Sequence, residues 1–247
     1  MHRHFLPTAR LHQPRIELTR DESRHLQTVL RLQSGDDVEL FDGAGTTVAA
    51  CVAAAGHRGL ELEPAAAPVR HPAPACRLVL FACVSKGRRM DWTVEKAVEL
   101  GVARIVPVIA ARSVVRLHDD AEADDKAGRW QRVAVETARQ CGAVWLPQLD
   151  APVPFADACT LVREHAPVFV AALAPGARPV REVLAERRSG PPPATAGWFV
   201  GPEGDFSPDE LRQAVAAGAI SVTLGRRVLR TETAAIWGLC VLGAEWL

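Results

Sequence analysis

The chain has 247 residues, of which 48% are hydrophobic and 23% are charged, proportions that exclude a wholly disordered protein. Its formal net charge is +0, so the field of the whole molecule does not predict attraction to a polyanion. No stretch approaches the ~18 uninterrupted apolar residues of a membrane helix. The basic start MHRHFLPTARLHQPR lacks the apolar core of a secretory signal, so we expect a cytoplasmic protein with no membrane partner.

The basic residues are nearly all arginines, since the only lysines among the 29 basic positions are Lys86, Lys96 and Lys126. Genome composition explains this bias most simply. The arginines nevertheless gather at 88–89, 112–116 and 226–230, so local basic patches are expected on a neutral protein.

The six cysteines do not have the spacing of a metal site, because they include no Cys-x-x-Cys pair. We expect reduced thiols in apolar settings. His2 and His4 are metal-binding residue types at a chain terminus, where such a pair is more often incidental. The sequence therefore predicts no metal.

Residues 1–70 carry the pattern of a small β-rich domain. The apolar or alternating runs VEL, TTVAACVAAA and GLELEP are separated by the turn signals SGDD and DGAG. One helix is expected near Asp21–Leu32, with a buried apolar stripe and a basic face. The stretch PAAAPVRHPAPAC at 64–76 has four prolines and no strand or helix period, which predicts an extended linker; we place the domain boundary at 71–76.

Residues 77–247 alternate between apolar strands and amphipathic helices. We expect strands at Leu78–Val84, Arg104–Ala110, Val168–Leu173, Trp198–Gly201 and Ala219–Leu224. We expect helices at Met90–Leu100, within Asp119–Cys141, and at Phe155–Glu164, Val180–Arg187, Pro208–Ala217 and Glu232–Trp246. Nearly continuous apolar strands alternating with helices are typical of a parallel sheet covered on both faces, so the second domain is predicted to be α/β.

A complete helix-start signal lies at 207–210, where the residues are Ser-Pro-Asp-Glu. Ser207 is the expected N-cap, Pro208 occupies the first helical position and Glu210 supplies a carboxylate at the third, which together form a capping box. Helix formation alone explains this signal, and it requires no function.

Two of the expected strands end in glycine-bearing loops. The first loop reads GPEGDF at 201–206, and the second begins at Gly225 and continues RRVLRTETAA. The carboxyl ends of strands in an open α/β sheet are where ligands usually bind, and glycine lets a ligand approach the backbone. Neither loop has the spacing of a nucleotide-phosphate loop. A ligand held by backbone amides and apolar side chains, such as adenosine with a sulfonium tail, fits better, although an ordinary strand-to-helix turn explains the first loop taken alone.

These loops resemble a known family. GPEGDFSPDE and LGRRVLRTETAA resemble the signature of the SPOUT-class RNA methyltransferases, and specifically of the RsmE family, which methylates N3 of a uridine in small-subunit ribosomal RNA. HLQTVLRLQSGDDVELFDG at 25–43 resembles the PUA-like RNA-binding domain of that family. KGRRMDWTVEKAVELGVARIVPV at 86–108 and RWQRVAVETARQCGAVWLP at 129–147 resemble its catalytic domain, so the resemblance covers essentially the whole chain.

The resemblance implies a fold and a cofactor. A small PUA-like β-barrel at 1–70 precedes a SPOUT domain at 77–247, whose parallel sheet is flanked by helices and ends in a trefoil knot. An S-adenosyl-L-methionine pocket lies within the knot, and two subunits form a homodimer beside it. Carried onto this sequence, the cofactor contacts are Leu173, Gly201, Pro202, Glu203, Gly204, Leu224, Gly225, Val228 and Leu229.

Methyl transfer to uracil N3 requires the loss of the N3 proton, so we expect a positive charge that stabilises the anion and a base that accepts the proton. Arg230 is the candidate for the charge because it directly follows the expected cofactor loop. Glu232 is the candidate for the base, although a favourable charge in the first turn of the last helix explains it equally well. Glu203 either orients the target or satisfies backbone donors in its own loop.

The RNA is expected to be held through its phosphates and its shape, because a chain with seven Phe, six Trp and no Tyr offers little surface for base stacking. The candidate phosphate ligands are Lys86, Arg88, Arg89 and Arg112 in the second domain and Arg15, Arg24 and Arg31 in the first. A solvated surface arginine explains Arg112 equally well.

Two positions depart from the family pattern. Asp205 stands where a second glycine is frequent, and Ala143 stands where an arginine is frequent. The predicted function is methylation of N3 of a uridine in 16S ribosomal RNA, with the assembled small subunit as substrate. The alternatives are a SPOUT-class ribose 2′-O-methyltransferase acting on transfer or ribosomal RNA, and a non-catalytic RNA-binding factor of ribosome assembly.

Overall fold

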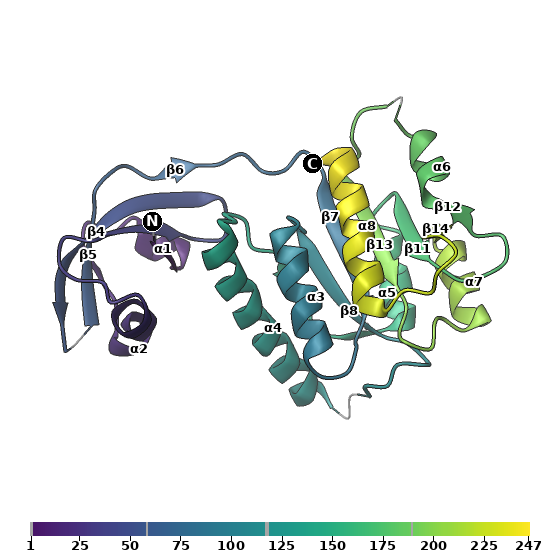
Figure 1. The fold of residues 1–247 in the computed structure, drawn as a ribbon, viewed down its shortest axis with the longest axis horizontal. Helices are drawn as coiled ribbons and strands as arrows, with labels where there is room; N and C mark the ends of the chain where they lie inside the picture. The colour runs from purple at the N-terminus through teal and green to yellow at the C-terminus, as the bar shows by residue number, and fades with distance from the viewer. Residues whose placement is uncertain (1, 58, 117–118, 189) are drawn as a thin grey trace. The chain divides into compact units, whose positions relative to one another are not determined.

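The structure is a computed structural model that describes residues 2–57, 59–116, 119–188 and 190–247 (Figure 1). The chain divides into two compact units. The first contains Met1–Ala73 and Val135–Leu146, and the second contains Pro74–Ala134 and Pro147–Leu247. Each unit has its own β-sheet and its own hydrophobic core.

The first unit is built on a mixed β-sheet. Its strands are β1 (His2–Phe5), β2 (Ile16–Glu17), β3 (Asp37–Phe41), β4 (Thr46–Gly56), β5 (Gly59–Pro64) and β6 (Val69–Arg70). In the described residues the strand order is β1-β3-β4-β5-β2, with β6 paired to β4. β1 and β3 are parallel and the other pairs are antiparallel. The predicted β-rich N-terminal domain is therefore confirmed.

The core of this sheet follows the alternation of the sequence. Val38 and Leu40 of β3 and Leu60 and Leu62 of β5 are buried in one apolar cluster together with Leu26. Successive side chains of a strand point to opposite faces, so alternate apolar positions reach the same core.

The helical part of the first unit differs from the sequence prediction. A short helix, α1 (Thr8–Leu11), precedes β2, and α2 (Arg20–Arg24) runs into η1 (His25–Val29), a π-helical turn. The predicted continuation to Leu32 is wrong. Arg31 has a φ of 55°, and a residue in this left-handed region cannot continue a right-handed helix.

Part of the stretch 64–76 is a strand rather than irregular linker. β6 pairs with β4 through Val69 and Arg70, and the His71 N–H donates to the Gly45 carbonyl over 2.8 Å. The sequence pattern missed this strand because two residues between prolines have no period to detect.

Residues Val135–Leu146 pack in the first unit, although they lie within the predicted second domain at 77–247. The Gly45 N–H donates to the Val144 carbonyl over 3.0 Å. The Trp145 indole covers Gly45, where a Cβ atom would lie 2.2 Å from the ring. A segment distant in sequence therefore completes the N-terminal unit.

The second unit alternates strands and helices. Its strands are β7 (Arg77–Cys83), β8 (Arg104–Ile109), β9 (Gln148–Leu149), β10 (Val153–Pro154), β11 (Val168–Ala171), β12 (Arg178–Pro179), β13 (Thr195–Val200) and β14 (Ala219–Thr223). Its helices are α3 (Arg88–Glu99), α5 (Phe155–Val162), α6 (Val180–Ala185), α7 (Pro208–Ala216), α8 (Thr231–Trp246) and most of α4 (Asp120–Cys141). Every strand and helix predicted for this domain is present, whereas the short strands β9, β10 and β12 were not predicted.

The sheet of the second unit is parallel throughout its described pairs. The strand order is β10-β8-β7-β13-β11-β14-β12, with β9 paired to β8. The order departs from chain order, because β13 lies between β7 and β11. In the register, Ala171 of β11 lies opposite Val200 of β13 and Val222 of β14. These three strands therefore end at the same level, and their following loops emerge together.

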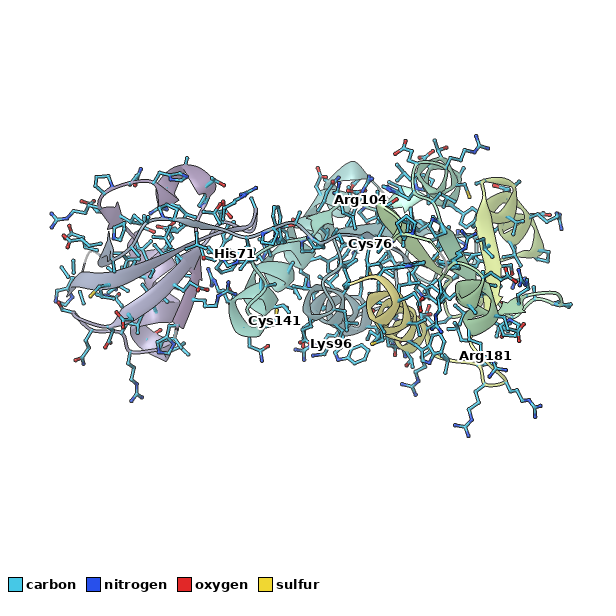
Figure 2. All side chains as sticks on the ribbon, turned by 90° about the horizontal axis from the view of Figure 1, so that it is seen from above. His71, Cys76, Lys96, Arg104, Cys141 and Arg181 are labelled. Atoms are coloured by element: carbon cyan, nitrogen blue, oxygen red, sulfur yellow. The ribbon has the colours of Figure 1, made fainter. Side chains whose placement is uncertain are left out.

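Helices cover both faces of this sheet (Figure 1). α5 and α7 pack on one face, where Phe155, Phe199 and Phe206 lie with ring centroids 5.0–5.5 Å apart. α8 packs on the other face, where Phe169 contacts both Trp198 and Trp246. Figures 1 and 2 both show α3 beside α8. The predicted α/β domain is confirmed.

The described residues contain neither a membrane span nor a metal cluster. No described helix is long and apolar enough to cross a membrane. Within the same ranges, no group of three or more His, Cys, Asp and Glu side chains is arranged to hold a metal ion. Burial raises the pKa of the Cys76 and Cys159 thiols to about 11. Cys141 and Cys240 are exposed, so the expectation of apolar settings is wrong for these two.

The capping box predicted at the start of α7 is confirmed. The Glu210 N–H donates to Ser207 Oγ over 3.2 Å, and the Ser207 N–H donates to Glu210 Oε2 over 2.8 Å. Two backbone donors at the helix start are satisfied in this way.

Ser207→Ala is expected to lower the free energy of unfolding by about 1 kcal/mol, because the Glu210 N–H loses its side-chain acceptor. Urea unfolding monitored by circular dichroism measures this change. An unfolding midpoint equal to that of the unmodified protein would show that the cap contributes no stability.

Candidate active site

A cavity of about 350 Å³ opens at the carboxyl ends of β11, β13 and β14. All of the predicted cofactor residues lie in the described part of the chain, and every one of them except Gly204 lines this cavity. Its lining also includes Arg89, Asp205, Arg227, Arg230 and Thr231. The two glycine-bearing loops, separate in the sequence, therefore form one site because their strands are neighbours of β11.

The first loop, 201–206, is a tight turn fixed by its own hydrogen bonds. Asp205 has a φ of 57°, its N–H donates to the Pro202 carbonyl over 2.9 Å, and its Oδ1 accepts the Phe206 N–H over 2.8 Å. Asparagine and aspartate tolerate this left-handed region better than most residues. The departure from the second glycine of the family pattern is therefore compatible with the same turn.

The two glycines of this loop are needed for different reasons. A Cβ atom on Gly201 would lie 3.2 Å from the Phe206 ring. A Cβ atom on Gly204 would lie 3.2 Å from Arg112 Cβ, and Arg112 Nη1 donates to the Gly204 carbonyl over 2.9 Å. Gly204 thus makes room for an arginine side chain rather than lining the cavity.

The second loop supplies most of the apolar lining. Leu224, Val228 and Leu229 border the cavity, and Val228 is 75% exposed. Leu173, from the loop after β11, lines the same cavity and is 56% exposed. Large apolar side chains left open beside a cavity are typical of a ligand site.

The two candidate catalytic residues lie at the start of α8 but in different surroundings. Arg230 is exposed, precedes the helix as its N-cap residue and lines the cavity. Glu232 is partly buried and is not part of the lining. Its Oε2 atom is buried and, among the described residues, has no hydrogen-bond partner. A buried carboxylate oxygen without a donor is costly, so this atom is suited to accept a proton or a hydrogen bond.

Glu203 and Arg89 form an ion pair at the cavity. Arg89 Nη1 lies 3.1 Å from Glu203 Oε1, and both residues line the cavity. Beneath the site, burial and the carboxylates of Glu210, Glu203 and Asp205 raise the pKa of the Cys83 thiol. Cys83 is therefore a neutral core residue and not a nucleophile.

Besides Arg89, which pairs with Glu203, two of the arginines predicted to bind RNA are already paired with acidic side chains. Arg15 pairs with Glu61 and Glu63, and Arg24 pairs with Asp21 over 2.8 Å. These carboxylates reduce the positive charge that a phosphate would meet. The sequence could not reveal the pairing of Arg15, because its partners lie on β5, far along the chain.

Three other residues predicted to bind RNA have a positive charge that no acidic side chain of the described residues pairs with. Arg31, Lys86 and Arg88 are exposed and have no ion pair within the described ranges. By contrast, Lys96 of α3 lies between Glu95 and Glu99, whose hydrogen bonds raise its pKa (Figure 2). Part of the unpaired positive charge of the second unit therefore lies near the start of α3.

Arg227 lines the cavity but was missed as a candidate site residue. It lies within the quoted motif LGRRVLRTETAA, between Gly225 and Val228, so the motif itself held the signal. Its neighbour Arg226 is exposed but does not line the cavity. The sequence alone does not show which of these two adjacent arginines faces the cavity.

Two family models match the chain. A model described as an RNA methyltransferase domain matches residues 71–243, and a model described as an RNA methyltransferase PUA domain matches residues 18–65. The first model covers every described strand of the second sheet, and the second model covers β3, β4 and β5 of the first sheet.

Relatives and solved structures agree with the family models. Ribosomal RNA small subunit methyltransferase E of Mycobacterium bovis is 33% identical over 230 residues, which cover 90% of this chain and 84% of that protein. The structure of a Legionella pneumophila methyltransferase in complex with SAM has a TM-score of 0.86 and 29% identity, covering 98% of this chain and 96% of that one. Ribosomal RNA small subunit methyltransferase E of Neisseria gonorrhoeae, bound to S-adenosyl methionine, has a TM-score of 0.86 and 28% identity, covering 100% of this chain and 98% of that one. The two-unit fold, the cavity between its two signature loops and these matches together show that the chain belongs to the ribosomal RNA small subunit methyltransferase E family.

Proposed function

We propose that this protein transfers a methyl group from S-adenosylmethionine to N3 of a uridine in 16S ribosomal RNA. The observation that carries the proposal is the single cavity formed by the loops 201–206 and 224–230, with Arg230 at its edge. The first loop lines this cavity with Gly201, Pro202, Glu203 and Asp205, and the second loop adds apolar side chains, so one site can hold the cofactor and present it to a base.

The residues of the cavity fit S-adenosylmethionine. The apolar side chains of Leu224, Val228 and Leu229 suit the adenosine, and the carboxylates of Glu203 and Asp205 suit the positive charges of the amino group and the sulfonium. When bound, the cofactor supplies an electrophilic methyl group on its sulfonium sulfur. The protein's task is then to align the uracil N3 with that carbon.

The reaction forms a bond between N3 and the methyl carbon, breaks the carbon–sulfur bond and releases the N3 proton. Arg230 stabilises the uracil anion, since its guanidinium reaches the cavity from the start of α8. Glu232 is the proposed proton acceptor through one bridging water, because its side chain does not line the cavity but its Oε2 has no hydrogen-bond partner among the described residues. Each role is carried by one side chain, and neither role requires a metal ion.

The RNA is held mainly by phosphate contacts at the start of α3, from the unpaired Lys86 and Arg88. Arg112 and Arg89 add to these contacts, Arg89 to a smaller extent because it is ion-paired with Glu203. The N-terminal residues 1–70 act as a PUA-like RNA-binding domain joined through 71–76 to the methyltransferase domain at 77–247. Arg31 contributes there more than Arg15 or Arg24, because the latter two are ion-paired. Since the substrate is ribosomal RNA, preferably within the assembled small subunit, we place its action in the cytoplasm.

RNA binding is expected to weaken as salt increases, because each phosphate contact releases counterions. Arg88→Ala should weaken binding and make the slope of log K against log salt shallower by about 0.7–0.9 for one lost contact. Fluorescence anisotropy with an RNA fragment over a range of salt concentrations measures the slope. Arg212→Ala, on the exposed side of α7 and outside the cavity, is the matched control and should leave the slope unchanged.

The protein is proposed to act as a homodimer that buries α8. This helix is apolar almost all round, and Thr233, Cys240, Ala244 and Leu247 are exposed along one stripe. We also propose that the cavity loops form a trefoil knot. The family resemblance that implies the dimer implies this knot as well.

Sedimentation is expected to give twice the mass of one chain for the unmodified protein, and Cys240→Arg should produce a monomer, because it adds a charge to the stripe. A monomeric unmodified protein would overturn the proposed dimer.

Mass spectrometry of ribosomal RNA nucleosides from cells without this protein, and after its return, tests the activity. We expect 3-methyluridine in 16S ribosomal RNA to disappear and then to be restored. A methyl mass on ribose would instead identify a 2′-O-methyltransferase. If no methylated nucleoside changes and calorimetry shows no binding of S-adenosylmethionine, the protein is a non-catalytic RNA-binding assembly factor.

A further inference from the structure

The Glu210 carboxylate holds two segments that are distant in sequence. Its Oε2 accepts the Ser207 N–H over 2.8 Å, as part of the capping box of α7. Its Oε1 accepts the Ala111 N–H over 2.7 Å. The side chain is buried, with the residue only 6% exposed. One carboxylate therefore joins the end of the loop 201–206 to the loop that follows β8.

The exposed side chain of Arg112 also connects these two loops. Its Nη1 donates to the Gly204 carbonyl over 2.9 Å, and its side chain occupies the space that a side chain at Gly204 would take. The loop 110–113 is itself fixed, because the Ala110 N–H donates to Ser113 Oγ and the Ser113 N–H donates to the Ala110 carbonyl, both over 3.0 Å. A turn next to β8, fixed by its own hydrogen bonds, thus contacts the cavity loop at Gly204 and the first turn of α7 at Glu210.

We infer that Glu210 and Arg112 form a clasp that positions the cofactor-binding loop 201–206. Neither Glu210 nor Arg112 lines the cavity. They act through the loop, whose residues Gly201, Pro202, Glu203 and Asp205 do line it. The inference rests on the proposed function only in taking this cavity as the site of S-adenosylmethionine.

The chemistry of the clasp requires a carboxylate at position 210. Both of its partners are backbone N–H donors, and an ionised carboxylate offers an acceptor oxygen to each. A glutamine has the same shape but only one acceptor oxygen, so its amide nitrogen would face one of the two donors. Glu210→Gln therefore breaks one half of the clasp with little change in volume.

Ser207→Ala is the matched control, because it removes only the hydroxyl that accepts the Glu210 N–H. The Ser207 backbone N–H and the contact from Glu210 to Ala111 both remain. Ser207→Ala therefore weakens the cap of α7 but keeps the contacts that hold the loop 201–206. Comparing the two variants separates an effect of lower stability on cofactor binding from an effect of a displaced loop.

Isothermal titration calorimetry with S-adenosylmethionine, well below the unfolding temperature of every variant, tests the clasp. We expect Glu210→Gln to raise the Kd about three- to tenfold, since a hydrogen bond to a charged group is lost. Arg112→Ala should raise the Kd in the same direction, and Ser207→Ala should leave it unchanged. With saturating cofactor the kcat of Glu210→Gln should recover, as a positioning role predicts a change in KM more than in kcat.

Equal Kd values for Glu210→Gln, Ser207→Ala and the unmodified protein would overturn the clasp while leaving the proposed function intact. If Glu210→Gln does not fold, Arg112→Ala decides the question, because its exposed side chain can be removed without opening the core; an unchanged Kd then refutes the inference. Failure of the unmodified protein to bind S-adenosylmethionine would instead refute the proposed function.

Discussion

Arg230→Ala is expected to lower kcat about 100-fold, because a preorganised charge beside the developing uracil anion contributes mainly to the transition state. The residue lines the cavity at the N-terminus of α8, where the backbone N–H groups add to its positive field. The Kd for S-adenosylmethionine should change by less than about threefold, since Arg230 is assigned to the target base and not to the cofactor.

Single-turnover kinetics with saturating RNA and cofactor, together with calorimetry, measure the two effects separately. Arg181→Ala is the matched control, because Arg181, labelled in Figure 2, is an exposed arginine of α6 in the same unit and does not line the cavity. Equal losses in turnover and in cofactor affinity would move Arg230 from the chemical step to cofactor binding.

Gly238→Ala is expected to lower the free energy of unfolding by about 3 kcal/mol or more, as severe overpacking does in a filled core. A Cβ atom at Gly238 would lie 1.8 Å from Trp198 Cε2. The Trp198 ring is fully buried, and its Nε1 donates to the Ala234 carbonyl over 3.0 Å, so the ring cannot move aside without losing a hydrogen bond. α8 would be pushed away from β13, and with it the start of the helix that bears Arg230.

Gly243→Ala on the same helix is the control. A Cβ atom there meets its nearest neighbour, Leu247 Cδ1, at an ordinary 3.6 Å. Replacing a helical glycine with alanine should then stabilise the protein by about 0.5–1 kcal/mol. Urea unfolding compares the two variants, and similar midpoints for both would contradict the close packing of Trp198 against Gly238.

The candidate site was predictable to the extent that it depends on strands and their following loops. Parallel strands present their carboxyl ends at one edge, so the two glycine-bearing loops were expected to meet, and they do meet in one cavity. The capping box at Ser207 was readable because all of its partners lie within four residues. The same local signal did not reveal that Glu210 also binds the Ala111 N–H.

Elements without a local period were not predictable. The two-residue strand β6 exists because β4 offers it a partner, and the helix that begins at Arg20 ends early where Arg31 takes a left-handed conformation. Neither feature changes the apolar pattern from which the elements were predicted. The boundary of the N-terminal unit was likewise hidden, because Trp145 packs on Gly45 from a hundred residues away in sequence.

The sequence by itself determined the α/β order of the second domain, the capping of α7 and the pair of loops that mark the family. These features depend on neighbouring residues, whose spacing fixes their geometry. Only the tertiary structure decided that Gly204 accommodates Arg112, that Arg15 is neutralised by Glu61 and Glu63, and that Glu210 joins two loops. These contacts connect residues far apart along the chain, and it is the packing of whole strands and helices that selects such partners.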